Sequence, residues 1–355
     1  MPSSTKGMPT AMEMRRELRG AVRPRWRAHW QQTMLRVKDP KKSLQFYQDH
    51  LGMTLIDKYK FEKFDFSLYF LASLKPGETY ELTPGTKEAH AYLWDCDRVT
   101  LELTHNHGTE EEEEFAYHPG NKEKDGFGHI AVAVDDVYEA SEDLLAKGVE
   151  FKKLPDEGRM KGLAFAYDPD NYWVEIVKRE GALDNAPKFA LSQTMLRIKD
   201  PAASLRFYTE LVGMQLVAER HYPKEKGDFS LYFLCNKEDV EGVDLPPSTT
   251  PEAMAYIKEN LYPKSIPVLE LTHNHGTESQ DGFRHHSGNE EPNKGFGHIG
   301  FLVDDLDSFC DALEQNGVEF KKKPSEGNMK GLAFALDPDG YWVEVIGRGL
   351  QVEEC

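Results

Sequence analysis

Apolar and polar positions alternate along the chain in a pattern that predicts short strands and amphipathic helices in a fixed order. Residues 32–38 read as a strand, and residues 40–51 place Leu44, Tyr47 and Leu51 at helical spacing. Three further strands follow this helix, and after a polar loop the same order starts again. The expected elements are strands near 53–60, 66–73 and 98–105, then a strand at 129–134, a helix at 136–147, and strands near 149–153, 162–167 and 172–177. The first half therefore predicts two βαβββ modules.

The second half repeats motifs of the first half in the same order. QTMLRVKDP at 32–40 returns as QTMLRIKDP at 193–201, and LELTHNHGTE at 101–110 returns unchanged at 269–278. MKGLAFAYDPDNYWVE at 160–175 returns as MKGLAFALDPDGYWVE at 329–344. The chain is a tandem duplication of α+β class with four βαβββ modules. We expect a flexible basic extension at 1–30, a first domain at 31–180, a linker at 181–190, a second domain at 191–347 and a tail at 348–355.

Composition narrows the classes of partner. The net charge of −18 disfavours nucleic acid and anionic membranes, and the chain contains no apolar run of the roughly 18 residues that a membrane helix needs. The four cysteines form no C-x-x-C pair, which favours a reducing compartment, and we expect the cytoplasm. The arginine-rich residues 1–30 leave an organellar transit peptide open.

Two short stretches raise the question of chemistry. GFGHIAVAVD at 126–135 and GFGHIGFLVD at 295–304 each begin a strand with a histidine. Their glycines resemble a dinucleotide-binding loop, but such a loop follows a strand and opens a helix, whereas these glycines precede a strand. The histidines are therefore the more informative feature.

Polar side chains recur at matching strand positions in every module. Alternation places Gln32 on the face of Met34 and Arg36, and places Glu102 on the face of Thr100 and Thr104. The module positions together are Gln32 and Glu102, His129 and Glu175, Gln193 and Glu270, and His298 and Glu344. Carboxylates, an amide and an imidazole are expensive to bury unless they are paired or bind a cation. Three oxygen donors and one nitrogen, without thiolate, suit an octahedral divalent metal.

Two alternatives to this metal set remain. Each polar residue by itself could face solvent on an amphipathic strand. The repeated His-Asn-His of THNHGTE, with His105 and His107 and again His273 and His275, could form a rival metal pair. That motif lies where a strand meets a glycine-containing loop, so we expect these histidines at the surface.

At these residues the sequence resembles glyoxalase I in its fused two-domain form. The motifs QQTMLRVKDPKKSL, FSLYFL, LELTHN, GFGHI and MKGLAF…DPDGYWVE occur in order, and the resemblance covers about residues 31–347. It implies the vicinal oxygen chelate fold and isomerisation of the glutathione-methylglyoxal hemithioacetal to S-D-lactoylglutathione, a detoxification of methylglyoxal.

The resemblance also implies how the halves combine. In homodimeric members a metal site takes Gln and Glu from one subunit and His and Glu from the other, so the halves of this chain should form an internal pseudo-dimer. Site A would use Gln32, Glu102, His298 and Glu344, and site B would use Gln193, Glu270, His129 and Glu175. Glu344 and Glu175 would be the general bases, with Glu102 and Glu270 acting on the opposite enantiomer. We expect one divalent metal in each site, namely zinc, with nickel, cobalt and manganese as alternatives.

Glutathione contacts carried over from the family fall on both halves. For site A they are Arg36, Asn106, Lys294, Lys322, Gly327 and Met329, and for site B they are Arg197, Asn274, Lys153, Gly158 and Met160. One position departs from the family, because the arginine usual before GFGH is Lys294 for site A and Asp125 for site B. Asp125 repels an anionic substrate, so we expect site A to bind the adduct more tightly.

Other activities stay open on the residues alone. An extradiol dioxygenase needs two histidines and one carboxylate for its iron, whereas each set here has one histidine. A glutathione transferase, an epimerase and a non-catalytic sequestering protein are the other candidates. Because a fused pseudo-dimer needs no partner, we expect a monomer.

Overall fold

A computed structural model describes residues 27–121, 126–158, 160–181, 183–327 and 329–352. Most of the predicted basic extension, with its possible transit peptide, lies outside these residues, and so does Asp125. The first strand already begins at Ala28, inside the range expected for the extension. Within the described residues, no helix has the length and apolarity to cross a bilayer.

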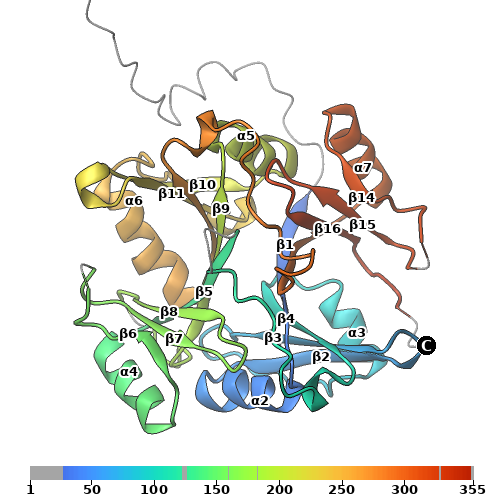
Figure 1. Cartoon of the computed structure of the whole chain (residues 1–355), viewed down its shortest axis with the longest axis horizontal. Helices are drawn as coiled ribbons and strands as arrows, with labels where there is room; N and C mark the ends of the chain where they lie inside the picture. The colour runs from blue at the N-terminus through green and yellow to red at the C-terminus, as the bar shows by residue number, and fades with distance from the viewer. Residues whose placement is uncertain (1–26, 122–125, 159, 182, 328, 353–355) are drawn as a thin grey trace, which may run out of the picture.

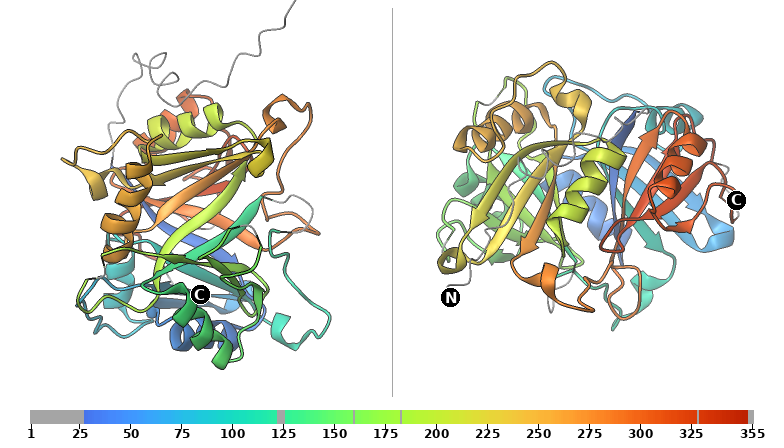
Figure 2. Two further views of the ribbon diagram at one scale, coloured as in Figure 1. Left: turned by 90° about the vertical axis from the view of Figure 1, so that its left-hand side faces the viewer. Right: turned by 90° about the horizontal axis from the view of Figure 1, so that it is seen from above.

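The fold consists of two eight-stranded mixed sheets with helices packed against them (Figures 1 and 2). The first sheet has the order β14 (Phe320–Lys322), β15 (Leu332–Leu336), β16 (Trp342–Gly347), β13 (Phe296–Val303), β1 (Ala28–Arg36), β4 (Thr100–Asn106), β3 (Phe66–Ala72) and β2 (Thr54–Phe61). The second has the order β10 (Gln215–Tyr222), β11 (Phe229–Cys235), β12 (Val268–Asn274), β9 (Ala190–Ile198), β5 (Phe127–Val134), β8 (Trp173–Lys178), β7 (Ala164–Tyr167) and β6 (Phe151–Lys153).

Each sheet therefore joins one module from each half of the chain. Antiparallel pairing of β1 with β13 unites the first module with the last, so the blue β1 lies beside the red strands in Figure 1. Antiparallel pairing of β5 with β9 unites the two middle modules. This arrangement confirms four βαβββ modules.

The helices agree with the expected pattern and add to it. The helix expected at 40–51 is α2 (Pro40–Leu44) continued by a π-helical segment, η1 (Gln45–His50), and its repeat is α5 (Pro201–Leu205) with η4 (Arg206–Val212). Asp39 caps α2 by accepting from the Lys41 N–H, and Pro40 supplies the fixed φ that suits a first helical turn. The other helices are α4 (Val137–Ala146) and α7 (Leu306–Gln315), and two that the pattern did not predict, α3 (Lys87–Leu93) and α6 (Pro251–Tyr256), the latter continued by η7 (Ile257–Leu261) and η8 (Tyr262–Lys264).

One apolar cluster packs the two halves together. It contains Trp30 of β1, Phe127 of β5 and Phe296 of β13, all buried, and the rings of Phe127 and Phe296 stack at 5.1 Å between centroids. These phenylalanines belong to the two GFGH repeats. The core therefore holds together the strands that carry His129 and His298.

Candidate metal centres

Strand register brings the predicted ligands of site A together. Gly300 of β13 lies between Gln32 of β1 on one side and Glu344 of β16 on the other. A Cβ at Gly300 would meet Gln32 Cγ at 2.6 Å, so Gln32 packs directly over the Gly300 backbone. Glu102 arrives from the other neighbour of β1, where β4 pairs in parallel.

The four side chains of site A meet at hydrogen-bonding distance. Gln32 Nε2 lies 2.7 Å from Glu102 Oε2 and 2.7 Å from Glu344 Oε2. His298 Nε2 lies 3.0 Å from Glu344 Oε2 and 3.2 Å from Glu102 Oε2. All four residues are buried. Glu102, His298 and Glu344 thus form a compact group that could hold a metal ion.

Site B repeats this geometry in the second sheet. Gln193 Nε2 lies 2.7 Å from Glu175 Oε2 and 2.8 Å from Glu270 Oε2, and 3.2 Å from His129 Nε2. Ala131, which pairs with Gln193 and with Glu175, takes the place of Gly300. His129, Glu175 and Glu270 form the second group that could hold an ion, and among the described residues these two groups alone meet that criterion.

The amide of the glutamine differs between the sites. In site B the Tyr262 hydroxyl donates to Gln193 Oε1 at 2.8 Å. In site A Gln32 Oε1 is buried and finds no hydrogen-bond partner within the described part of the chain. Sequence comparison did not single out Tyr262, because its helix was not predicted.

In each site, burial and the neighbouring charged side chains shift the pKa values of the cluster residues. Burial lowers the pKa of His298, but Glu344 and Glu102 outweigh it and raise the pKa to about 9. Burial raises the pKa of Glu344, and burial together with Glu175 raises the pKa of Glu270 to about 7. Two buried carboxylates held this close call for a positive charge between them. A divalent cation fits the donor set when the Gln32 amide is turned over, so that the unpartnered Oε1 takes the place of Nε2 between the two carboxylates.

A cavity of about 620 Å³ opens over site B. Its lining includes the site-B ligands and three of the predicted glutathione contacts, Met160, Arg197 and Asn274. Asn121, which the sequence comparison missed, also lines it and accepts from Arg197 Nη2 at 2.8 Å. The other two predicted contacts lie together, since a Cβ added at Gly158 would lie 3.7 Å from Lys153 Cε. The Lys153 ammonium donates to the Leu163 carbonyl at 2.5 Å.

Most of the residues predicted to contact glutathione in site A form hydrogen bonds to other groups of the protein. The Arg36 guanidinium donates to Asn289 Oδ1 at 2.8 Å and to main-chain carbonyls of the facing half, and burial lowers its pKa. Lys322 Nζ donates to the Leu332 carbonyl at 2.7 Å, near Gly327. The remaining three predicted contacts are Asn106, which donates to the Tyr117 hydroxyl, Lys294, whose Nζ is 3.9 Å from Glu291, and Met329, which is exposed.

The expectation of surface placement was wrong for the first histidine of each His-Asn-His motif. His105 and His273 are buried, because β4 and β12 run on through Asn106 and Asn274. Each bonds the glutamate five residues later, His105 to Glu110 at 2.7 Å. Strand alternation turns them to the face opposite Glu102 and Glu270. The motif does not join a metal group among the described residues.

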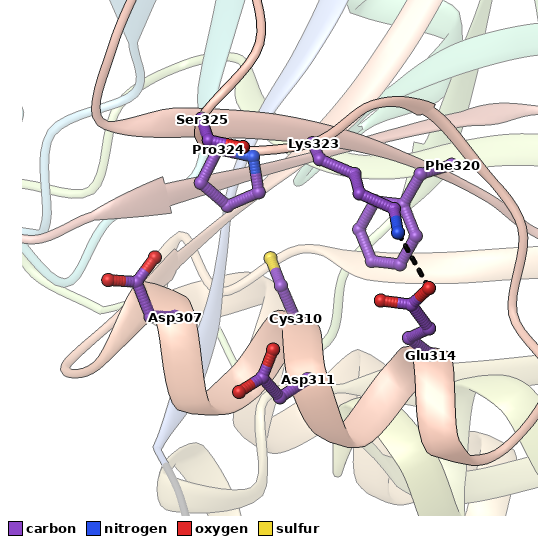
Figure 3. A pocket seen from close by; sticks show the side chains of 8 residues that line it. All are labelled: Asp307, Cys310, Asp311, Glu314, Phe320, Lys323, Pro324 and Ser325. Atoms are coloured by element: carbon purple, nitrogen blue, oxygen red, sulfur yellow. Dashed lines mark hydrogen bonds and ion pairs between the residues drawn. The ribbon is translucent and has the colours of Figure 1, made fainter.

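A second hollow, of about 150 Å³, lies between α7 and the chain that follows β14 (Figure 3). The Cys310 thiol faces it, and Lys323 bonds Glu314 across one end at 2.6 Å. Burial raises the pKa of Cys310 to about 12, so the thiol is not a ready nucleophile.

The fold agrees with comparisons to known proteins. Residues 29–176 and 190–345 both match the family model described as the Glyoxalase/Bleomycin resistance protein/Dioxygenase superfamily. The structure of glyoxalase I from Zea mays superposes with a TM-score of 0.61 over 91% of this chain and 93% of that one, at 22% identity, which supports the fold alone.

Two relatives show to which family within this superfamily the chain belongs. The lactoylglutathione lyase of Schizosaccharomyces pombe is 43% identical over 88% of this chain and 94% of its own length. Glyoxalase I of Saccharomyces cerevisiae is 39% identical over 90% of this chain and 92% of its own. The chain belongs to the lactoylglutathione lyase family, also called glyoxalase I.

Proposed function

We propose that this chain converts the hemithioacetal of glutathione and methylglyoxal into S-D-lactoylglutathione at two sites, A and B. The observation that carries the proposal is the convergence of Gln32 and Glu102 with His298 and Glu344, from opposite ends of the chain, on one buried point. The same set recurs in site B. A non-catalytic sequestering protein has no need of two such clusters, one of which opens into a cavity.

The proposed ligands of each cation are the glutamine, the histidine and the two glutamates of its site. When bound, a divalent cation supplies a Lewis acid that stabilises negative charge developing on the substrate oxygens, an effect worth several kcal/mol. Zinc is our first choice, with nickel, cobalt and manganese compatible with the same oxygen-rich set.

The glutamates carry the proton transfer. Glu344 in site A and Glu175 in site B take the proton from the carbon that bears sulfur, leaving an enediolate, and return a proton to the neighbouring carbon. Burial, which raises the pKa of Glu344, also strengthens it as a base. Glu102 and Glu270 stand on the other side of each cluster and serve the opposite enantiomer of the hemithioacetal.

Glutathione is anionic, so its arm needs local positive charge in a chain of net charge −18. In site B we assign this role to Arg197, which lines the cavity and is held in place by Asn121. Arg36 and Asn289 repeat the arrangement in site A. Since both sites are completed within one chain, we propose that the protein works as a monomer.

Glutamine substitutions of the two bases test the assignment. Thioester absorbance with methylglyoxal and glutathione should report turnover by the metal-loaded protein and by each of E344Q and E175Q. The double variant should lose at least about a thousandfold in turnover of the enantiomer assigned to Glu344 and Glu175. Chelation should abolish activity and metal addition should restore it. Full activity in the double variant, or in the metal-free protein, would exclude this mechanism.

A further inference from the structure

The helix beside site B presents a lysine to the cavity. Met254, Lys258 and Tyr262 lie four residues apart along α6, η7 and η8, so they share one helix face, and all three line the cavity. The last of them, Tyr262, donates to Gln193 Oε1 at 2.8 Å. Lys258 therefore stands one helical turn from a residue that touches a proposed metal ligand.

Arg220 of β10 brings another positive charge to the same cavity, whose lining also includes Arg197, Lys161 and Lys178. Lys178 is paired with Glu180 at 3.2 Å, and Lys161 donates to the Asp156 carbonyl. The Arg220 guanidinium donates to three main-chain carbonyls, those of Thr250 at 2.8 Å, Glu219 at 3.0 Å and Pro251 at 3.2 Å. These bonds fix its position without neutralising it. Among the described residues neither Arg220 nor Lys258 forms an ion pair with a carboxylate.

These two cations lie away from the proposed glutathione end. Arg197 is on β9, and the sheet order β10-β11-β12-β9 places Arg220 three strands from it, about 14 Å away. Arg197 faces the other half of the sheet, where it bonds Asn121 and the Phe127 carbonyl. Arg197 thus lies at one end of the cavity, and Arg220 and Lys258 lie at another. The site-B metal ligands line the same cavity.

Site A has aromatic residues at the corresponding positions. In the repeated FSLYFL strands, Leu68 pairs with Tyr59 and Leu231 pairs with Arg220, so Tyr59 replaces Arg220. The repeats EAHAYLW and EAMAYIK likewise replace Lys258 by Trp94.

These aromatic residues pack against one another. Trp94 Nε1 donates to the Tyr59 hydroxyl at 2.7 Å, Tyr59 stacks on His90 at 4.1 Å, and Trp94 contacts the edge of Phe70 at 5.5 Å between centroids. Tyr59 and Trp94 are both buried. The wall that is cationic in site B is therefore aromatic in site A.

We propose that site B is specialised for adducts of 2-oxoaldehydes whose carbonyl substituent carries an anionic group, with Arg220 and Lys258 as the residues that select it. Site A, with its aromatic wall, takes alkyl and aryl substituents. The inference rests on the proposed function, since it assigns the substituent of the same substrate class.

Single-site enzymes separate the two specificities. E344Q, which loses the first-assigned base of site A, and E175Q, which loses that of site B, are compared with methylglyoxal, phenylglyoxal and 4,5-dioxopentanoate, a 2-oxoaldehyde with a terminal carboxylate. The ratio of kcat/KM for 4,5-dioxopentanoate to kcat/KM for methylglyoxal should be at least about tenfold higher for E344Q, because hydrogen bonds to charged groups are the stronger ones. Phenylglyoxal should favour E175Q.

Substitution of the cations provides the matched control. In the E344Q background, K258M and R220Q should each lower that ratio several-fold, whereas K258R should retain it. Equal ratios in E344Q and E175Q would overturn the inference while leaving the proposed function intact. A proportional loss for all substrates in K258M and R220Q would also overturn it, since these residues would then bind glutathione. Failure of both single-site enzymes and of the parent protein to turn over methylglyoxal would instead remove the proposed function.

Discussion

Thr33 and Thr194 hydrogen-bond through their hydroxyls, with 2.7 Å between the two Oγ1 atoms. Both residues are buried, and each directly follows a glutamine of a metal cluster, Gln32 or Gln193. One bond between equivalent residues of the two halves therefore links the strands, β1 and β9, that carry the two sites. The bond joins the two sites through the residues that directly follow their glutamines.

We expect the two threonines to show strong energetic coupling. T33V or T194V alone leaves one buried hydroxyl without its partner, which costs about 1 to 3 kcal/mol of unfolding free energy. The double valine variant removes both hydroxyls and should lose less than the sum of the single variants. Urea unfolding of all four proteins completes the double-mutant cycle. Strict additivity would show that the bond contributes nothing specific.

Tyr262 should strengthen metal binding in site B and have no effect on metal binding in site A. Y262F removes the hydroxyl that donates to Gln193 Oε1, and the loss of such a partner commonly costs about 10- to 100-fold in metal affinity. Site A is the internal control, because Gln32 has no comparable donor in the described structure. Titration with a coloured chelator should show one weakened site of two. Equal weakening of both sites, or of neither, would contradict this role.

The buried pair Asp337 and Asp339 should make the protein less stable as the pH rises. Burial raises the pKa of Asp337 to about 7 and of Asp339 to about 6, and the charge of Asp339 contributes to the shift of Asp337. Since these values exceed the unfolded value, the folded state holds protons that the unfolded state has lost. Stability is therefore lost as pH rises from about 4 through about 7.

D339N removes one charge of this pair and should flatten that decline by on the order of 2 kcal/mol. Urea midpoints of the parent and D339N between pH 5 and pH 8 provide the measurement. The difference between the two curves cancels titration at the metal clusters, which both proteins share. Parallel curves would show that the pair does not titrate in this range.

The KM values of the two sites should differ for methylglyoxal. Lys294 supplies positive charge to site A, where Asp125 is the counterpart for site B, so the glutathione adduct should have the lower KM at site A. E175Q, which retains site A, should therefore show a lower KM than E344Q. K294D in the E175Q background should raise the KM toward that of site B. Indistinguishable KM values in the two single-site enzymes would contradict the prediction.

Local patterns predicted the faces of strands well, but not the neighbours of strands. Alternation placed Gln32 with Met34 and Arg36, and Glu102 with Thr100 and Thr104. In the structure these faces of β1 and β4 coincide, with Gln32 Nε2 2.7 Å from Glu102 Oε2. The union of β1 with β13 depends on pairing between residues far apart in the sequence, which alternation does not encode, so it came from the family resemblance. Family knowledge thus supplied the pairing of the halves.

Other features were missed for identifiable reasons. Helices α3 and α6 are short and lie in long polar connections, so their periodicity was weak, and Tyr262 and Lys258 were missed with them. His105 was misplaced because the strand continues one residue past it, through Asn106, before the glycine loop begins.

The sheet order also dictates a sequence of assembly during synthesis. The strands of site B belong to consecutive modules and are all present once β12 ends at Asn274. Site A instead waits for β16, which ends at Gly347, because β1 stays without its β13 neighbour until the last module has emerged. A ribosome-bound chain thus completes one centre well before the other, and β1, which is buried in the finished fold, must be kept from wrong partners in the meantime.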